Sequence, residues 1–258
     1  MRLMKRILSA AAVLALSASL LVGCSSGTAS SVPVSASSAA ESTVSSVEET
    51  ASSAVDENEA AAAQLLNDLT GSYQELWPVI LADEYKQTWL DDCTALVGED
   101  NAEAAFEKLS SMVTGDVYGE DAVKAYANGG GAYFCGFTNS LAILTFDGET
   151  STISGTDKDG NVLFSHTYHY IGMEPVRGLY EFQSDDADSG EFTYFFLAPD
   201  TSAETYHIEF RYGSDAEALS QYDTGEYAYW LASGISTDCD QTRIDNCIEL
   251  FCTENLAG

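Results

Sequence analysis

His207 and Glu209 are the residues of this sequence whose types and spacing best suit metal chemistry. They lie two positions apart in residues 206–212, a run of aromatic and β-branched residues that predicts a strand. Side chains two positions apart on a strand point to the same face, and zinc accepts both imidazole nitrogen and carboxylate oxygen. The pair is therefore a candidate site for zinc or another divalent cation. On spacing alone an ordinary solvent-facing pair is the favoured interpretation, because this spacing often arises by chance.

The two remaining histidines are weaker candidates. His166 and His169 are three positions apart, so on a strand they face opposite sides and at most one could point into a barrel beside His207. We expect both to be surface histidines. The folded domain predicted over 58–258 has no Gly-x-Ser-x-Gly elbow, and its Gly129 to Gly131 run lacks the Lys-Ser/Thr of a phosphate loop. A glycosidase pair among the 41 acidic residues stays open, but we predict a protein that is not an enzyme.

The secondary-structure elements that must position these residues are predicted from two sequence patterns, one helical and one typical of strands. Apolar residues at helical spacing predict helices over 60–69, 84–97, 101–113 and 240–254, and residues 58–127 are helical in texture throughout. Between them, short aromatic and β-branched runs are separated by turn residues. They predict strands over 141–146, 150–154, 162–171, 178–182, 192–198 and 206–212. The predicted fold class is α+β, an antiparallel meander closed into a small barrel with flanking helices, and His207 and Glu209 are expected to face its interior.

The charge of the chain excludes one class of partner. The 258 residues carry 10 basic and 41 acidic side chains, a formal net charge of −31. Phosphate backbones would repel such a surface, so we predict no nucleic-acid binding. The same charge raises the local concentration of cations.

The N-terminal segment predicts export and lipid anchoring. Residues 1–23 combine a basic start with a short apolar run typical of a signal peptide. The run ends in Leu-Val-Gly-Cys, which resembles a bacterial lipobox, so Cys24 is the predicted lipidation site. Residues 24–57 are Ser-rich and free of aromatics, as in a disordered tether, and a folded domain follows over 58–258. We predict a lipoprotein on the outer face of a bacterial cell membrane, which the chain contacts through its lipid only.

The sequence does not determine what its cysteines do. An oxidising compartment permits disulfides. A metal site built from cysteines is disfavoured, because the sequence contains no Cys-x-x-Cys pair. Spacing does not choose among the pairings, and an odd number leaves at least one thiol free or paired between chains. The five cysteines in question are Cys93, Cys135, Cys239, Cys247 and Cys252.

Five segments, taken in order, resemble the ZinT family of bacterial zinc-binding proteins. No single segment is specific, but together they extend over roughly residues 66–255. The resemblance implies a lipocalin-like (calycin) barrel and a role in zinc uptake, delivering zinc to the binding protein of an ABC importer. The segments are Leu-Thr-Gly-Ser-Tyr-Gln-Glu-Leu-Trp at 69–77, Tyr-His-Tyr-Ile-Gly at 168–172, residues 192–199 ending in Leu-Ala-Pro, His-Ile-Glu-Phe-Arg-Tyr-Gly-Ser-Asp at 207–215, and Glu-Tyr-Ala-Tyr-Trp-Leu at 226–231.

The family's ligands carry over only in part. His207 falls on the first histidine of the family's His-x-His, and Glu209 replaces the second, an exchange that zinc tolerates. The third ligand falls at Phe195 or Phe196 and is lost. The resemblance therefore implies a reduced metal site without turnover. The alternative is a barrel that has lost its metal and binds a small organic ligand or a protein partner.

Overall fold

The computed structural model describes residues 57–126, 131–199 and 207–257. The predicted signal peptide, Cys24 and the predicted tether up to residue 56 lie outside these residues, so export and lipidation stay predictions. Within the described ranges, no helix is long and apolar enough to cross a membrane. Residues 57–68 are helical, so helix begins close to the predicted start of the folded domain.

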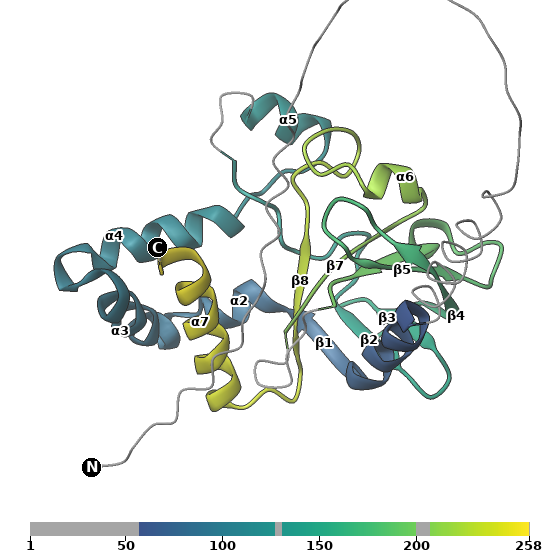
Figure 1. The fold of residues 1–258 in the computed structure, drawn as a ribbon, viewed down its shortest axis with the longest axis horizontal. Helices are drawn as coiled ribbons and strands as arrows, with labels where there is room; N and C mark the ends of the chain where they lie inside the picture. The colour runs from purple at the N-terminus through teal and green to yellow at the C-terminus, as the bar shows by residue number, and fades with distance from the viewer. Residues whose placement is uncertain (1–56, 127–130, 200–206, 258) are drawn as a thin grey trace, which may run out of the picture. The chain divides into compact units, whose positions relative to one another are not determined.

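Eight antiparallel strands form a closed barrel in which each strand pairs with its neighbours in sequence and β8 pairs with β1 (Figure 1). The predicted fold class, an antiparallel barrel with flanking N-terminal and C-terminal helices, is confirmed. The strands are β1 (Gly71–Glu75), β2 (Ile143–Asp147), β3 (Thr152–Thr156), β4 (Val162–Met173), β5 (Tyr180–Ser184), β6 (Tyr194–Leu197), β7 (His207–Gly213) and β8 (Ala232–Ser236).

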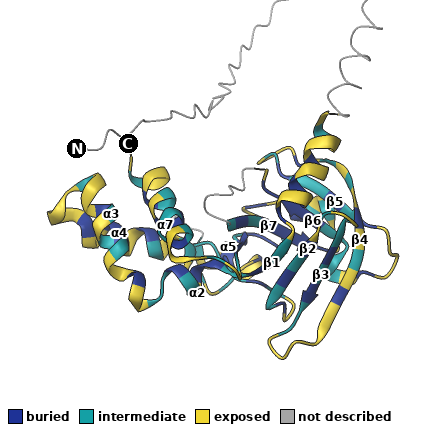
Figure 2. Cartoon of the chain, turned by 90° about the horizontal axis from the view of Figure 1, so that it is seen from below, coloured by how far each residue is buried: buried dark blue, intermediate teal, exposed yellow. Residues whose placement is uncertain are grey.

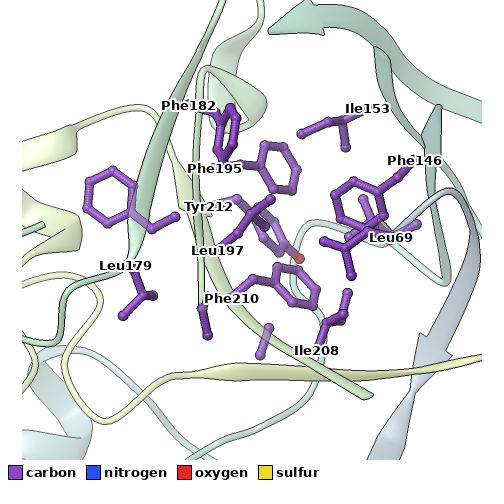
Figure 3. Packing of buried hydrophobic residues seen from close by; sticks show 14 of the residues in the cluster. Leu69, Phe146, Ile153, Leu179, Phe182, Phe195, Leu197, Ile208, Phe210 and Tyr212 are labelled. Carbon is purple, nitrogen blue, oxygen red and sulfur yellow. The ribbon is translucent and has the colours of Figure 1, made fainter. Parts of the chain in front are cut away.

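Aromatic side chains fill the barrel interior (Figure 3). Phe195 of β6 is fully buried, and its ring centroid lies 5.3 Å from that of Tyr212 and 5.4 Å from that of Tyr168. Phe210 and Phe182 belong to the same cluster, and the helix over 57–68 adds leucines to it. The interior is therefore a packed core.

A second core lies among the helices. Figure 2 shows α3, α4 and α7 grouped together beside the strands. Trp89 of α3 is fully buried, donates its indole N–H to the Ile80 carbonyl at 2.7 Å, and packs edge-on against Phe251 of α7. Ile235 of β8 belongs to this core and joins it to the barrel wall. The helices are α2 (Leu76–Ile80), α3 (Lys86–Val97), α4 (Glu99–Val113), α5 (Glu120–Tyr126), α6 (Ala216–Leu219) and α7 (Gln241–Leu256), with short 3-10 turns at Asp83–Tyr85 and Gly190–Phe192.

Two strands of the barrel differ from the sequence prediction. β1 falls inside the region predicted to be helical, and β8 falls in a stretch for which no strand was predicted. β8 is buried at four of its five positions, so it lacks the alternation that indicates a half-exposed strand. The predicted helix over 101–113 begins earlier, at Glu99, directly after Gly98 with its positive φ of 84°.

Candidate functional site

His207 and Glu209 lie on the outer face of β7. Ile208, Phe210 and Tyr212 take the alternate positions and belong to the interior core. The prediction that the pair shares a face is consistent with this alternation, but the prediction that it faces the barrel interior is wrong. The apolar residues of β7 fill the interior, and the polar residues are left on the other side.

The outer face of β7 is covered here by helices, so the pair is not on an open surface. His207 and Glu209 are both half-buried and line a small hollow of about 30 Å³. Glu254 of α7 lines the same hollow and adds a carboxylate from the end of the chain. The remaining lining residues are Leu76, Trp77, Ile80, Cys247, Leu250 and Phe251.

The side chains around this hollow suit a cation only in part. Over the described ranges, no group of three or more His, Cys, Asp or Glu side chains is arranged to hold a metal ion. Burial raises the pKa of the Cys247 thiol to about 12, so without a metal it stays protonated near neutral pH and a cation would have to displace its proton to bind there. The donors that need no such proton loss are the imidazole of His207 and the carboxylates of Glu209 and Glu254.

Sequence reasoning missed Glu254 as a member of this hollow. It lies near the end of α7, a helix recognised from its apolar periodicity. Nothing in the sequence marks this carboxylate among 41 acidic residues.

Glu209 also lines a second hollow of about 230 Å³. Arg177 lies on its wall, together with apolar residues around the end of β6. The Glu209 carboxylate therefore borders two hollows, and the larger of them also has the Arg177 guanidinium on its wall. The other lining residues are Leu179, Ala198, Pro199 and Leu231.

The other two histidines pair with aspartates away from this hollow. His166 shares the inward face of β4 with Phe164 and Tyr168, and its Nδ1 lies 2.6 Å from Asp186 Oδ2. Its side chain is only 18% exposed, so the expectation of a surface histidine is wrong for His166. His169 is 53% exposed on the opposite face, as predicted, with Nδ1 2.7 Å from Asp185 Oδ1.

Phe195 and Phe196, where the resemblance puts the lost third ligand, are far from the histidine of β7. Phe195 pairs with Tyr212 across the strands and faces the interior, while Phe196 pairs with Arg211. These partners are four and five positions along β7 from His207, roughly 13–17 Å at the usual rise of a strand. A histidine at either position would not share a site with His207.

Arg211, the next outward residue of β7 after Glu209, is fully buried. Its guanidinium donates to the carbonyls of Leu219 and Tyr227 and lies 4.4 Å from the centre of the Tyr222 ring. Burial lowers its pKa to about 10. These contacts hold the segment after β7 against the barrel, which is a structural role.

A larger hollow of about 350 Å³ lies outside the barrel, between α2, the end of α4 and residues 134–136. Its lining is mostly apolar, with the Glu75 carboxylate, which accepts from the Phe137 N–H at 2.6 Å, on its wall. The indole N–H of Trp77 is buried without a hydrogen-bond partner among the described residues, and the Cys135 thiol, a weak acceptor, lies beside it. The lining residues are Glu75, Trp77, Pro78, Leu81, Val113, Thr114, Gly115, Phe134, Cys135 and Gly136.

Comparison with known proteins gives structural likeness without a match in sequence. No family model and no curated protein matches this chain. The Zn(II)-bound ZinT-like domain of AdcA from Streptococcus pneumoniae is similar, with a TM-score of 0.45 and 15% identity over 71% of this chain and 89% of that one. Zn(II)-bound AdcA of the same organism gives a TM-score of 0.41 and 15% identity over 72% of this chain and 35% of that one. At these TM-scores and identities, neither likeness carries an argument about what this chain binds or does.

Proposed function

We propose that this protein binds a divalent cation, zinc first, at the hollow between β7 and α7, without catalytic turnover. The observation that carries the proposal is that His207, Glu209 and Glu254 line one hollow. An imidazole and two carboxylates are donors that zinc accepts, and water would complete a four-coordinate shell.

The hollow as it stands is too small and too loosely arranged for a tight site. At about 30 Å³ it has room for roughly one water molecule, so side chains must shift for a cation to enter. Glu254 is the donor best placed to move, because it lies in the last turn of a terminal helix. A site assembled in this way releases its cation readily, which suits capture and delivery better than permanent storage.

The proposed role in cation uptake at the membrane rests on features of the sequence. Lipidation at Cys24 would hold the domain at the outer face of the membrane, and the charge of −31 would concentrate cations around it, an effect that salt screens. The ordered resemblance to ZinT supports delivery of the cation to the binding protein of an ABC importer.

Zinc titration of the purified protein by calorimetry tests the proposal. His207→Ala and Glu209→Gln should each weaken binding at least about tenfold, because each removes one of few ligands. His169→Ala is the matched control, since that histidine lies on the outer face of β4 and does not line this hollow. Absence of zinc binding, or affinity that is equal in the His207 and His169 variants, would refute the proposal.

A second function, binding of a small organic ligand, is favoured by the hollow at Trp77. The alternative of a ligand inside the barrel does not fit, because aromatic side chains occupy the interior. An apolar hollow of about 350 Å³ suits a compact apolar ligand. Mass spectrometry of molecules that copurify with the wild-type protein and leave the Trp77→Phe variant would support it. An equal yield from both proteins would exclude this site.

A further inference from the structure

We propose that Cys93 and Cys252 form a disulfide that joins α3 to α7. Their sulfur atoms lie 3.9 Å apart although the residues are 159 positions apart in sequence. Both side chains are fully buried where the two helices pack together. The proposal is independent of the cation site.

The two sulfur atoms are neighbours but are not at bonding distance. A disulfide requires a sulfur–sulfur distance of about 2.05 Å, so the two atoms, which belong to free thiols in the structure, must approach by roughly 1.9 Å. Rotation about the Cα–Cβ bond of each cysteine moves its sulfur, and movement of the helices must close any distance that remains.

Two other cysteines of this core, Cys247 and Cys135, are placed differently. Cys247 is five positions before Cys252 on α7, which puts the two about 140° apart around the helix. Cys247 accordingly lines the hollow beside His207, whereas Cys252 meets Cys93. The Cys135 thiol lies outside α3 and α7 and donates weakly to the Tyr133 carbonyl, with 3.7 Å between sulfur and oxygen.

The bond forms by thiol–disulfide exchange. Each of the two cysteine thiols loses one proton and one electron to make the bond, and one disulfide of an oxidant such as oxidised glutathione becomes two thiols. Burial raises the pKa of both Cys93 and Cys252 in the folded chain, so little reactive thiolate is present there. We therefore expect oxidation during folding, while α7 docks against α3 and the two thiols are still accessible.

The bond would act on the C-terminal helix. It links α7 to α3 across a loop that contains strands β2 to β8, and so keeps the last helix in place when the rest of the structure fluctuates. Glu254 lies two residues beyond Cys252 on the same helix. The disulfide would thus steady one wall of the hollow that holds His207 and Glu209.

A disulfide map of the full chain tests the inference. The denatured, reduced protein is refolded in a glutathione redox buffer, alkylated and digested with trypsin and a Glu-specific protease. Cleavage after Glu249 separates Cys247 from Cys252, which trypsin alone leaves in one peptide. We expect residues 87–99 linked to residues 250–254 and two fewer titratable thiols per chain. A map in which Cys93 or Cys252 is alkylated, or linked to another cysteine, overturns the inference.

Thermal unfolding with and without a reducing agent provides a second test of the disulfide. A reducing agent should lower the melting temperature of the oxidised protein by roughly 5–15 °C, as expected for loss of a disulfide in a domain of this size. The Cys135→Ala variant should show the same drop, and Cys93→Ala should show none. An equal drop in both variants would contradict the proposed pairing. If Cys93→Ala does not fold, the map of the wild-type chain alone decides.

Discussion

Truncation of Phe195 tests whether the barrel interior is packed. The side chain is fully buried, and aromatic rings from β4 and β7 surround it at centroid distances of 5.3 to 6.4 Å. Phe195→Ala loses about 2–3 kcal/mol of transfer free energy. Since a closed barrel collapses poorly, an unrelaxed cavity of roughly 80 Å³ would add about 2 kcal/mol. We expect the free energy of unfolding to fall by about 4 kcal/mol.

Equilibrium unfolding in urea measures this loss. With a slope near 2 kcal/mol per molar urea, the midpoint should fall by about 2 M. Val176→Ala is the control, because Val176 is 64% exposed and its truncation should cost less than about 0.5 kcal/mol. If Phe195→Ala shifts the midpoint no more than this control does, the interior is loosely filled and a ligand inside the barrel becomes possible again.

Three further predictions follow from other contacts. Burial raises the pKa of Cys135 and Cys247 from the ordinary 9.0 to about 12, so their thiols ionise in the unfolded chain before they do so in the folded one. The stability present below pH 9 should be lost between pH 9 and 12, by up to about 1.4 kcal/mol per pH unit for each thiol. Urea unfolding at several pH values should show a shallower decline for Cys135→Ala, and an unchanged decline would refute the assignment. Asp240→Ala removes the carboxylate that accepts from the Arg243 N–H at 3.0 Å and caps α7, so it should cost about 1 kcal/mol of unfolding free energy, while Asp238→Ala should cost little. Equal costs would argue against the cap. Phe195→His should lower stability without tightening zinc binding in calorimetry, because this position faces the packed interior. A tighter zinc site in this variant would contradict the strand register.

The sequence by itself predicted most strands of the barrel and the helices that flank it. Alternating apolar residues and turn chemistry marked β2 to β7, because each is half-exposed or bounded by polar turns. β1 and β8 were missed. β8 is covered on both faces, so its residues do not alternate, and β1 is a short strand directly followed by helix. Their pairing, which closes the barrel, depends on contacts between opposite ends of the domain.

The candidate site shows the same division. The spacing of His207 and Glu209 placed them on one face of a strand from sequence alone. The packing of the barrel decided that this is the outer face. Ile208, Phe210 and Tyr212 fill the interior, so the polar residues of β7 lie under the helices. Glu254 joins them only through the docking of α7.

The cysteines make the distinction sharpest. Their spacing in the chain left every pairing open, because nothing local distinguishes Cys93 from the other thiols. The packing of α3 against α7 brings Cys93 to within 3.9 Å of Cys252. Local pattern reports how a residue lies relative to the axis of its own helix or strand. Which residues distant in sequence come into contact depends on the packing of whole elements, and only the tertiary structure decided that.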